Sequence, residues 1–258
     1  MMTSAESAVE FVAALELPPS PEGAAFESSA SDAQIIENDQ LLSIGSQIAE
    51  FASGVTADLR KDISNSLLLA QLAADNTGNP AQNSEQWYES YVTVLKNTGW
   101  VVENAEWTIQ EFSGQGAEVH NEIIPFVTAA LAAGGAAAPI VVKLLEGLSD
   151  VHIDRPWITL FERVSKRAFG GQFQIAHVRA DAQGKPLLLL ALFGLDSRTQ
   201  LVQILFLKLS ESSVTLRQGQ TALSLNEPLF RATAPAIAQK VAAHANDFID
   251  NIDLQGIV

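Results

Sequence analysis

A run of twenty residues without a charge, at positions 123–142, constrains the fold of this chain more than any other feature of its sequence. As a single helix the run would be about 30 Å long, which matches the hydrocarbon core of a bilayer. Its eight strongly apolar side chains would supply roughly −2 to −5 kcal/mol of insertion free energy. Pro125, Pro139 and the pair Gly134-Gly135 oppose one continuous helix. The sequence therefore predicts that this run does not span a membrane constitutively.

The same glycines and prolines favour a helical hairpin. Gly134-Gly135 is typical of a turn and Pro139 of the first turn of a helix, so we expect helices at 122–133 and 138–148. Two alternatives stay open: the hairpin is stored inside a soluble pore-forming protein until it is triggered, or it is ordinary core in which Ala and Gly allow close packing. The candidate membrane- or lipid-contacting residues are Ile123, Ile124, Phe126, Val127, Leu131, Ile140, Val141 and Val142.

Carboxylates flank this hairpin on both sides, at Glu118, Glu122, Glu146 and Asp150. They oppose insertion while they are charged, and protonation removes that barrier. Because the pKa of an ordinary carboxyl lies near 4, we expect membrane binding triggered in this way to appear only below about pH 5.

The remaining sequence predicts an α+β fold, in which N-terminal helices and a C-terminal helix pack on a mainly antiparallel sheet of about five strands. Residues 1–32 read as a helix and a flexible linker, and residues 33–258 as a single α+β domain. Apolar residues recur at helical spacing over 33–98 and 118–168, and a closing helix is expected at 227–250. The stretches 99–112 and 171–225 read as sheet, with the continuous apolar run 187–195 as a strand covered on both faces and 201–209 and 214–218 as further strands.

Charge and cysteine content exclude several classes of function. The chain carries 30 acidic and 15 basic residues, a formal charge of −15, which disfavours nucleic-acid binding. It has no cysteine, so disulfides, thiolate nucleophiles and zinc–thiolate sites are absent. Glu6, Glu10 and Glu16 interrupt the N-terminal segment where a secretory signal would be apolar, so we expect a protein that is cytoplasmic until release, or secreted without a classical signal peptide.

No catalytic, metal or cofactor motif is recognisable, which favours a protein that is not an enzyme. His120 lies between two glutamates, but a solvated helix start explains that spacing better than a metal site does. His177 and Asp181 are the best acid–base pair that the sequence offers. A basic cluster is a candidate anion site, or else it pairs with the acidic N-terminal half. Its residues are Arg155, Arg163, Lys166 and Arg167.

Several aromatic stretches resemble a known group of bacterial proteins. These are residues 86–95 (QWYESYVTVL) with 99–102 (GWVV), the strand start 171–175 (GQFQI), and Leu225-Asn226. They resemble a little-characterised group associated with the virulence factor Evf, over about residues 84–255. The resemblance implies an α/β-type fold and an effector or toxin-like role. Evf-like proteins are associated with an acylated cysteine, which this chain lacks, so a lipid-anchored mechanism is not carried over.

These observations lead to two functional hypotheses. The first is a bacterial effector, virulence or toxin-like protein that acts at membranes or lipids through the apolar hairpin, with membrane lipid or a fatty acyl chain as its partner. The alternative is a non-catalytic protein-binding or assembly module, in which the hairpin is ordinary core and the partner is another protein or a second copy.

Overall fold

The computed structural model of the chain describes residues 4–18, 34–36, 38–77, 84–111, 118–132, 139–148, 156–167, 170–181, 183–197, 200–201, 203–208 and 214–250. The helices are α1 (Ala5–Ala14), α2 (Ala57–Asp75), α3 (Ser84–Asn97), α4 (Val119–Leu131), α5 (Ile140–Gly147), α6 (Pro156–Ser165) and α7 (Glu227–Asp250). The strands are β1 (Gln34–Ile36), β2 (Asn38–Ile44), β3 (Gln47–Phe51), β4 (Trp100–Glu111), β5 (Lys166–Arg167), β6 (Gly170–Ala180), β7 (Pro186–Ser197) and β8 (Val214–Leu225). The predicted linker before residue 33 and the predicted turn at 134–135 lie outside the described residues.

One mixed sheet forms the centre of the molecule, in the order β1-β2-β3-β6-β7-β8-β4, with β5 paired to β6. Every pairing is antiparallel except that of β3 with β6, which is parallel. The predicted α+β class is therefore confirmed, and the sheet has eight strands where the sequence predicts about five. Strands β6, β7 and β8 are consecutive in the chain and adjacent in the sheet; residues 181–185 join β6 to β7, and the longer connection 198–213 joins β7 to β8.

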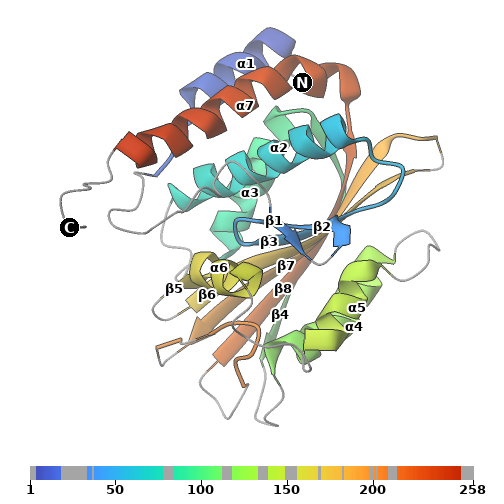
Figure 1. The fold of residues 1–258 in the computed structure, drawn as a ribbon, viewed down its shortest axis with the longest axis vertical. Coiled ribbons are helices and arrows are strands. Elements are labelled where there is room, and N and C mark those ends of the chain that lie inside the picture. Colours follow the sequence, from blue (N-terminus) through green and yellow to red (C-terminus); the bar gives the residue numbers. More distant parts are fainter. Residues whose placement is uncertain are drawn as a thin grey trace.

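Helices cover both faces of this sheet (Figure 1). Helices α2, α3 and α7 pack on one face, and α1 lies outermost against α7. Helices α4, α5 and α6 pack on the other face, where their apolar side chains join those of β6 and β7 in a second core. The helices α4 and α5 lie side by side, at the lower right of Figure 1. The molecule thus has three layers, and the apolar hairpin forms part of one outer layer.

Two predicted elements are wrong. Residues 34–51 lie within the stretch 33–98 predicted to be helical, but they form β1, β2 and β3. Gly45 adopts a φ of +56° at the turn between β2 and β3, and both strands are buried, so their apolar residues are too dense to show alternation. Residues 201–209 are predicted to form a strand, but among them residues 203–208 form turns, with one isolated bridge between Lys208 and Glu118.

The stretch 86–95, which resembles the Evf-associated group, contributes Trp87, Tyr88 and Tyr91 to the hydrophobic core between the sheet and helices α2, α3 and α7. The rings of Trp87 and Tyr91 on α3 are stacked, with centroids 5.3 Å apart. The hydroxyl of Tyr88 accepts a hydrogen bond from the amide of Phe193 and lies 3.0 Å from the carbonyl oxygen of Phe173. These contacts fix α3 to the centre of the sheet, so the shared residues act in packing.

Candidate functional site

The structure brings the eight candidate lipid-contacting residues together on α4 and α5. Five of them are buried: Ile123, Val127, Leu131, Val141 and Val142. The other three are half-buried: Ile124, Phe126 and Ile140. All eight pack into the second core, where the ring of Phe126 meets that of Phe193 on β7 edge-on, with centroids 5.7 Å apart. In this conformation the hairpin is a packed layer of the protein.

The outer side of α4 differs from that of an ordinary surface helix. Such a helix normally presents charged or polar side chains to solvent. After Glu122, α4 carries no charge, and its exposed positions are Pro125 and Ala129. Half-buried Ile124 and Phe126 continue the apolar surface between them. The helix is therefore uncharged on its outward side after Glu122, where Thr128 is the one polar side chain.

Backbone hydrogen bonds anchor the start of α4 to the segment 203–208. The amides of Val119 and His120 donate to the carbonyl oxygens of Leu207 and Leu205, at 3.0 and 2.9 Å. The imidazole of His120 is fully buried, and its Nδ1 lies 2.9 Å from the Leu205 oxygen and 3.5 Å from Glu118. The predicted solvated environment of His120 is therefore wrong, because this side chain is part of the anchor.

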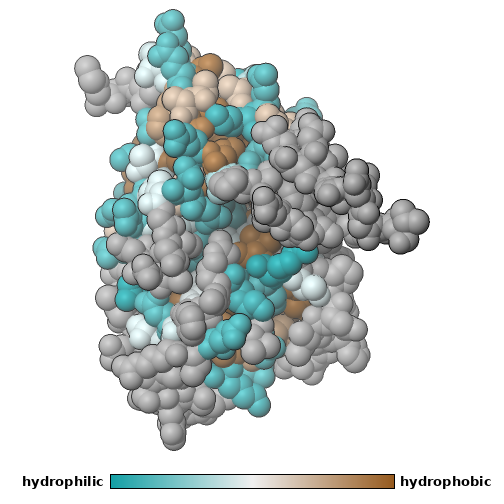
Figure 2. Space-filling model, turned by 90° about the vertical axis from the view of Figure 1, so that its left-hand side faces the viewer, coloured by the Kyte–Doolittle hydropathy of each residue, from teal (hydrophilic) through white to brown (hydrophobic). Residues whose placement is uncertain are grey.

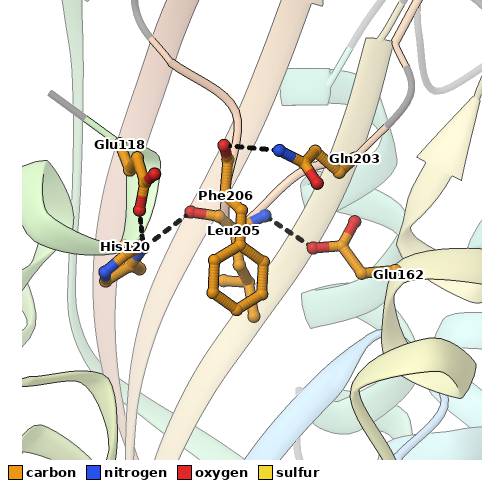
Figure 3. Close-up of polar contacts among 6 residues, drawn as sticks. All are labelled: Glu118, His120, Glu162, Gln203, Leu205 and Phe206. Atoms are coloured by element: carbon orange, nitrogen blue, oxygen red, sulfur yellow. Dashed lines mark hydrogen bonds and ion pairs between the residues drawn. The ribbon is translucent and has the colours of Figure 1, made fainter. Parts of the chain in front are cut away.

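A buried carboxylate holds the same segment from its other side. Glu162 of α6 accepts hydrogen bonds from the amides of Ile204 and Leu205, the latter at 2.7 Å. Burial raises the pKa of Glu162, against the effect of these two amides and of the nearby Lys166 charge. The segment 203–208 is thus fixed between α6 and the start of α4, as Figure 3 shows.

A second buried carboxylate meets the start of α5. Oε2 of Glu50 on β3 accepts a hydrogen bond of 2.9 Å from the amide of Val141. Nδ1 of His177 on β6 lies 3.5 Å from the other oxygen of Glu50. The hairpin is therefore joined to the rest of the protein by apolar packing and by polar contacts near its two helix starts.

The other candidate residues are not assembled into a site. Asp181 does not meet His177; its carboxylate accepts hydrogen bonds from the amides of Gln183 and Lys185, at 2.8 Å each, within a turn. Of the basic cluster, Arg163 is exposed and Lys166 is half-buried near Glu162, while Arg155 and the side chain of Arg167 lie outside the described residues. Within the described part of the chain, no three His, Asp or Glu side chains are grouped to hold a metal ion.

The described helices and one face of the molecule were compared for apolar character. No described helix combines the length and the apolar character needed to cross a membrane. The side of the molecule turned away from α4 and α5 shows hydrophilic residues interspersed with hydrophobic patches (Figure 2).

Comparisons with known proteins give matches in structure alone. No protein-family model and no curated protein sequence matches the chain. A delta-endotoxin matches with a TM-score of 0.41 at 12% identity, over 78% of this chain and 94% of its own. The activated Cyt2Ba monomer from Bacillus thuringiensis subsp. israelensis matches with a TM-score of 0.33 at 12% identity, over 71% of this chain and 98% of its own.

The Evf virulence factor is also among the matching structures, with a TM-score of 0.30 at 11% identity over 80% of each chain. The loose resemblance to Evf seen in the sequence is thus confirmed. These three matches are a delta-endotoxin, the Cyt2Ba monomer and a virulence factor, and at these TM-scores the likeness says nothing about the activity of this chain.

Proposed function

We propose that this chain is a toxin-like or virulence-type effector that acts at membranes or lipids through the helix pair α4–α5. The observation that carries the proposal is the outward side of α4, which carries no charge after Glu122 and has Thr128 as its one polar side chain from there to the end of the helix. A helix surface without charge, with Ile124 and Phe126 half-buried beside it, can meet another apolar surface. Lipid is the partner we favour, because the helix pair can leave the sheet without breaking any strand pairing.

Release of α4 and α5 from the sheet would leave the strand pairing intact. Every ladder of the sheet runs between strands, and neither α4 nor α5 contributes to one. Detaching the pair removes apolar packing in the second core and the polar contacts near Val119 and Val141. A lipid environment would replace that apolar packing, since burial in hydrocarbon restores most of the transfer free energy that exposure to water would cost.

One observation favours the alternative, a protein-binding or assembly module with the pair as permanent core. Five of the eight candidate residues are fully packed in the described conformation. A protein partner would then use only the outward positions of α4, and α5 would never separate from β3. The two functions differ in whether the buried face of the hairpin ever reaches lipid.

Vesicle flotation at pH 7.5 and pH 3.5, with dye release in parallel, tests the proposal. The probe is neutral phosphatidylcholine vesicles, so that the net charge of the protein has little effect. We expect the wild-type protein to float at pH 3.5. Ile124→Lys should reduce the bound fraction on the order of a hundredfold, because a lysine in hydrocarbon costs about 3 kcal/mol and stays charged at both pH values.

Val92→Lys is the matched control. Val92 is also a half-buried apolar residue on a helix, but it lies on α3, on the other face of the sheet. We expect this variant to float like the wild type. Protein that stays at the bottom of the gradient at both pH values, or equal loss of binding in both variants, would contradict the membrane function and favour a protein partner.

A further inference from the structure

Helix α5 depends on a distant side chain for its N-terminal cap. Pro139 occupies the N-cap position and makes no side-chain capping bond. The acceptor is supplied by Glu50 of β3, whose Oε2 lies 2.9 Å from the amide nitrogen of Val141, 91 residues further along the chain. Because the first turn of a helix favours negative charge, an ionised Glu50 both caps α5 and complements its dipole.

Glu50 belongs to a row of residues that crosses four strands. Leu41 of β2, Glu50, His177 of β6 and Leu189 of β7 lie in register with one another, and all four are buried. Nδ1 of His177 has no hydrogen-bond partner among the described residues, and its distance of 3.5 Å from Glu50 is that of an ion pair. An acid and a base are thus enclosed together between the sheet and α5.

The groups that face Glu50 favour its ionised form. From β6 it meets His177, from β2 only the apolar Leu41, and from α5 the amides of Ile140 and Val141. Burial is the largest influence and raises the pKa of Glu50, but the contacts with His177 and with the two amides outweigh it and hold the pKa below the ordinary value of 4.5. The charged side chains of α5 are both exposed: Lys143 and Glu146.

We propose that Glu50 is an acid-released latch for the helix pair. Its ionised carboxylate holds the start of α5 on the sheet, and its protonation frees that end. This inference rests on the proposed function for its biological purpose, since release would present the apolar hairpin to lipid. The flanking carboxylates give a different trigger, and Glu146 among them makes no described contact with the sheet.

The direction of the pH effect follows from the lowered pKa of Glu50. A group with a lowered folded-state pKa stabilises the closed state above its unfolded value, and this contribution is lost as the pH falls through the folded value. The latch is therefore closed above pH 4.5 and opens below it.

The anchor of α4 responds to acid in the opposite sense. Burial raises the pKa of Glu162, so the part of its contribution to stability that depends on protonation is present in full below the unfolded pKa and is lost as the pH rises through the raised value. Acid therefore frees the α5 end, while Glu162 keeps holding the segment that binds the start of α4. The helix pair opens from one side.

Hydrogen exchange of the full chain, without lipid, tests the latch. We expect the amides of residues 141–147 to exchange about tenfold faster at pH 3.5 than at pH 6, after correction for the intrinsic pH dependence of exchange. The amides of Val119 and His120 should keep their protection over the same range. Equal protection of α5 at both pH values would overturn the proposal, as would simultaneous loss at both helix starts.

Substitutions separate Glu50 from the other carboxylates. Glu50→Gln removes the charge, so α5 should exchange about tenfold faster at pH 7, whereas Glu146→Gln, on the same helix, should behave as wild type. His177→Gln keeps the carboxylate but removes a contact that lowers its pKa, so the midpoint of opening should move to higher pH. This second variant decides the matter if Glu50→Gln does not fold. No shift in His177→Gln, or opening in Glu146→Gln, would overturn the latch.

Hydrogen exchange tests the latch and flotation tests the membrane function, so either hypothesis can be contradicted without the other. Opening of α5 in acid without vesicle binding contradicts the membrane function and leaves the latch intact. Vesicle binding that is the same for wild type and Glu50→Gln at both pH values, with α5 protected throughout, contradicts the latch and leaves the membrane function intact.

Discussion

Gly99→Ala is expected to lower the free energy of unfolding by about 2–5 kcal/mol. Gly99 joins α3 to β4 with a φ of +113°, a conformation that L side chains rarely adopt. A Cβ atom there would lie 2.9 Å from the backbone nitrogen of Phe230, on α7. Since the neighbour is helical backbone, it cannot turn aside as a flexible side chain would. Urea unfolding of the purified variant measures the change.

Gly184→Ala is the matched control for this prediction. Gly184 also has a positive φ, +81°, but no atom lies within 4 Å of the position its Cβ would take. We expect a loss of only about 1–2 kcal/mol, from backbone strain alone. Equal losses in the two variants would mean that the close approach of Gly99 to α7 contributes nothing.

Glu162→Ala is expected to destabilise the protein by about 2–5 kcal/mol at pH 7. Its carboxylate accepts hydrogen bonds from two buried amides, those of Ile204 and Leu205, and the variant leaves both without an acceptor. An unsatisfied buried donor costs about 1–3 kcal/mol, partly offset here because the ionised carboxylate no longer has to be buried. The midpoint of urea unfolding again provides the measurement.

The comparison residue for this loss is Glu146, an exposed glutamate on α5. Glu146→Ala should change the free energy of unfolding by no more than about 0.5 kcal/mol. The difference between the variants should grow as the pH is lowered toward 4.5, because the raised pKa of Glu162 makes its stabilising contribution larger in acid. A Glu162→Ala variant as stable as Glu146→Ala would contradict the anchoring role.

The strands that could be predicted are those with a pattern visible in local sequence. The continuous apolar run 187–195 predicts a strand covered on both faces, and β7 is buried along most of its length. The partial alternation after Trp100 predicts a strand over 99–112, which the structure has as β4.

Elsewhere the apolar pattern is ambiguous because burial, not secondary structure, sets it. Strands β2 and β3 are packed on both faces, so Leu41, Leu42 and Ile44 follow one another closely and mimic a helical spacing. Residues 204–206 are equally apolar, yet they form a buried turn. Its backbone makes hydrogen bonds with the start of α4 and with Glu162 of α6. Gly45 was the available local signal for the turn between β2 and β3.

The hairpin could be predicted from the sequence, but its anchors could not. Pro139 correctly predicts the start of α5. Glu50 and Glu162, however, act on backbone amides that are 91 and 42–43 residues away. Every residue except proline has a backbone amide, so the sequence does not show which amides a carboxylate will bind. Neither carboxylate can therefore be distinguished from a surface acid by sequence.

The parallel pairing of β3 with β6 has a consequence for how the chain is made. The amide of Gln174 donates to the carbonyl oxygen of Ser46, 128 residues earlier, so the sheet cannot close until most of the chain has left the ribosome. Contacts of such long sequence separation slow folding, because loop closure comes before any compensating contact. In the meantime the apolar strand β3 remains without its neighbour β6, which exposes the nascent chain to aggregation and to chaperones.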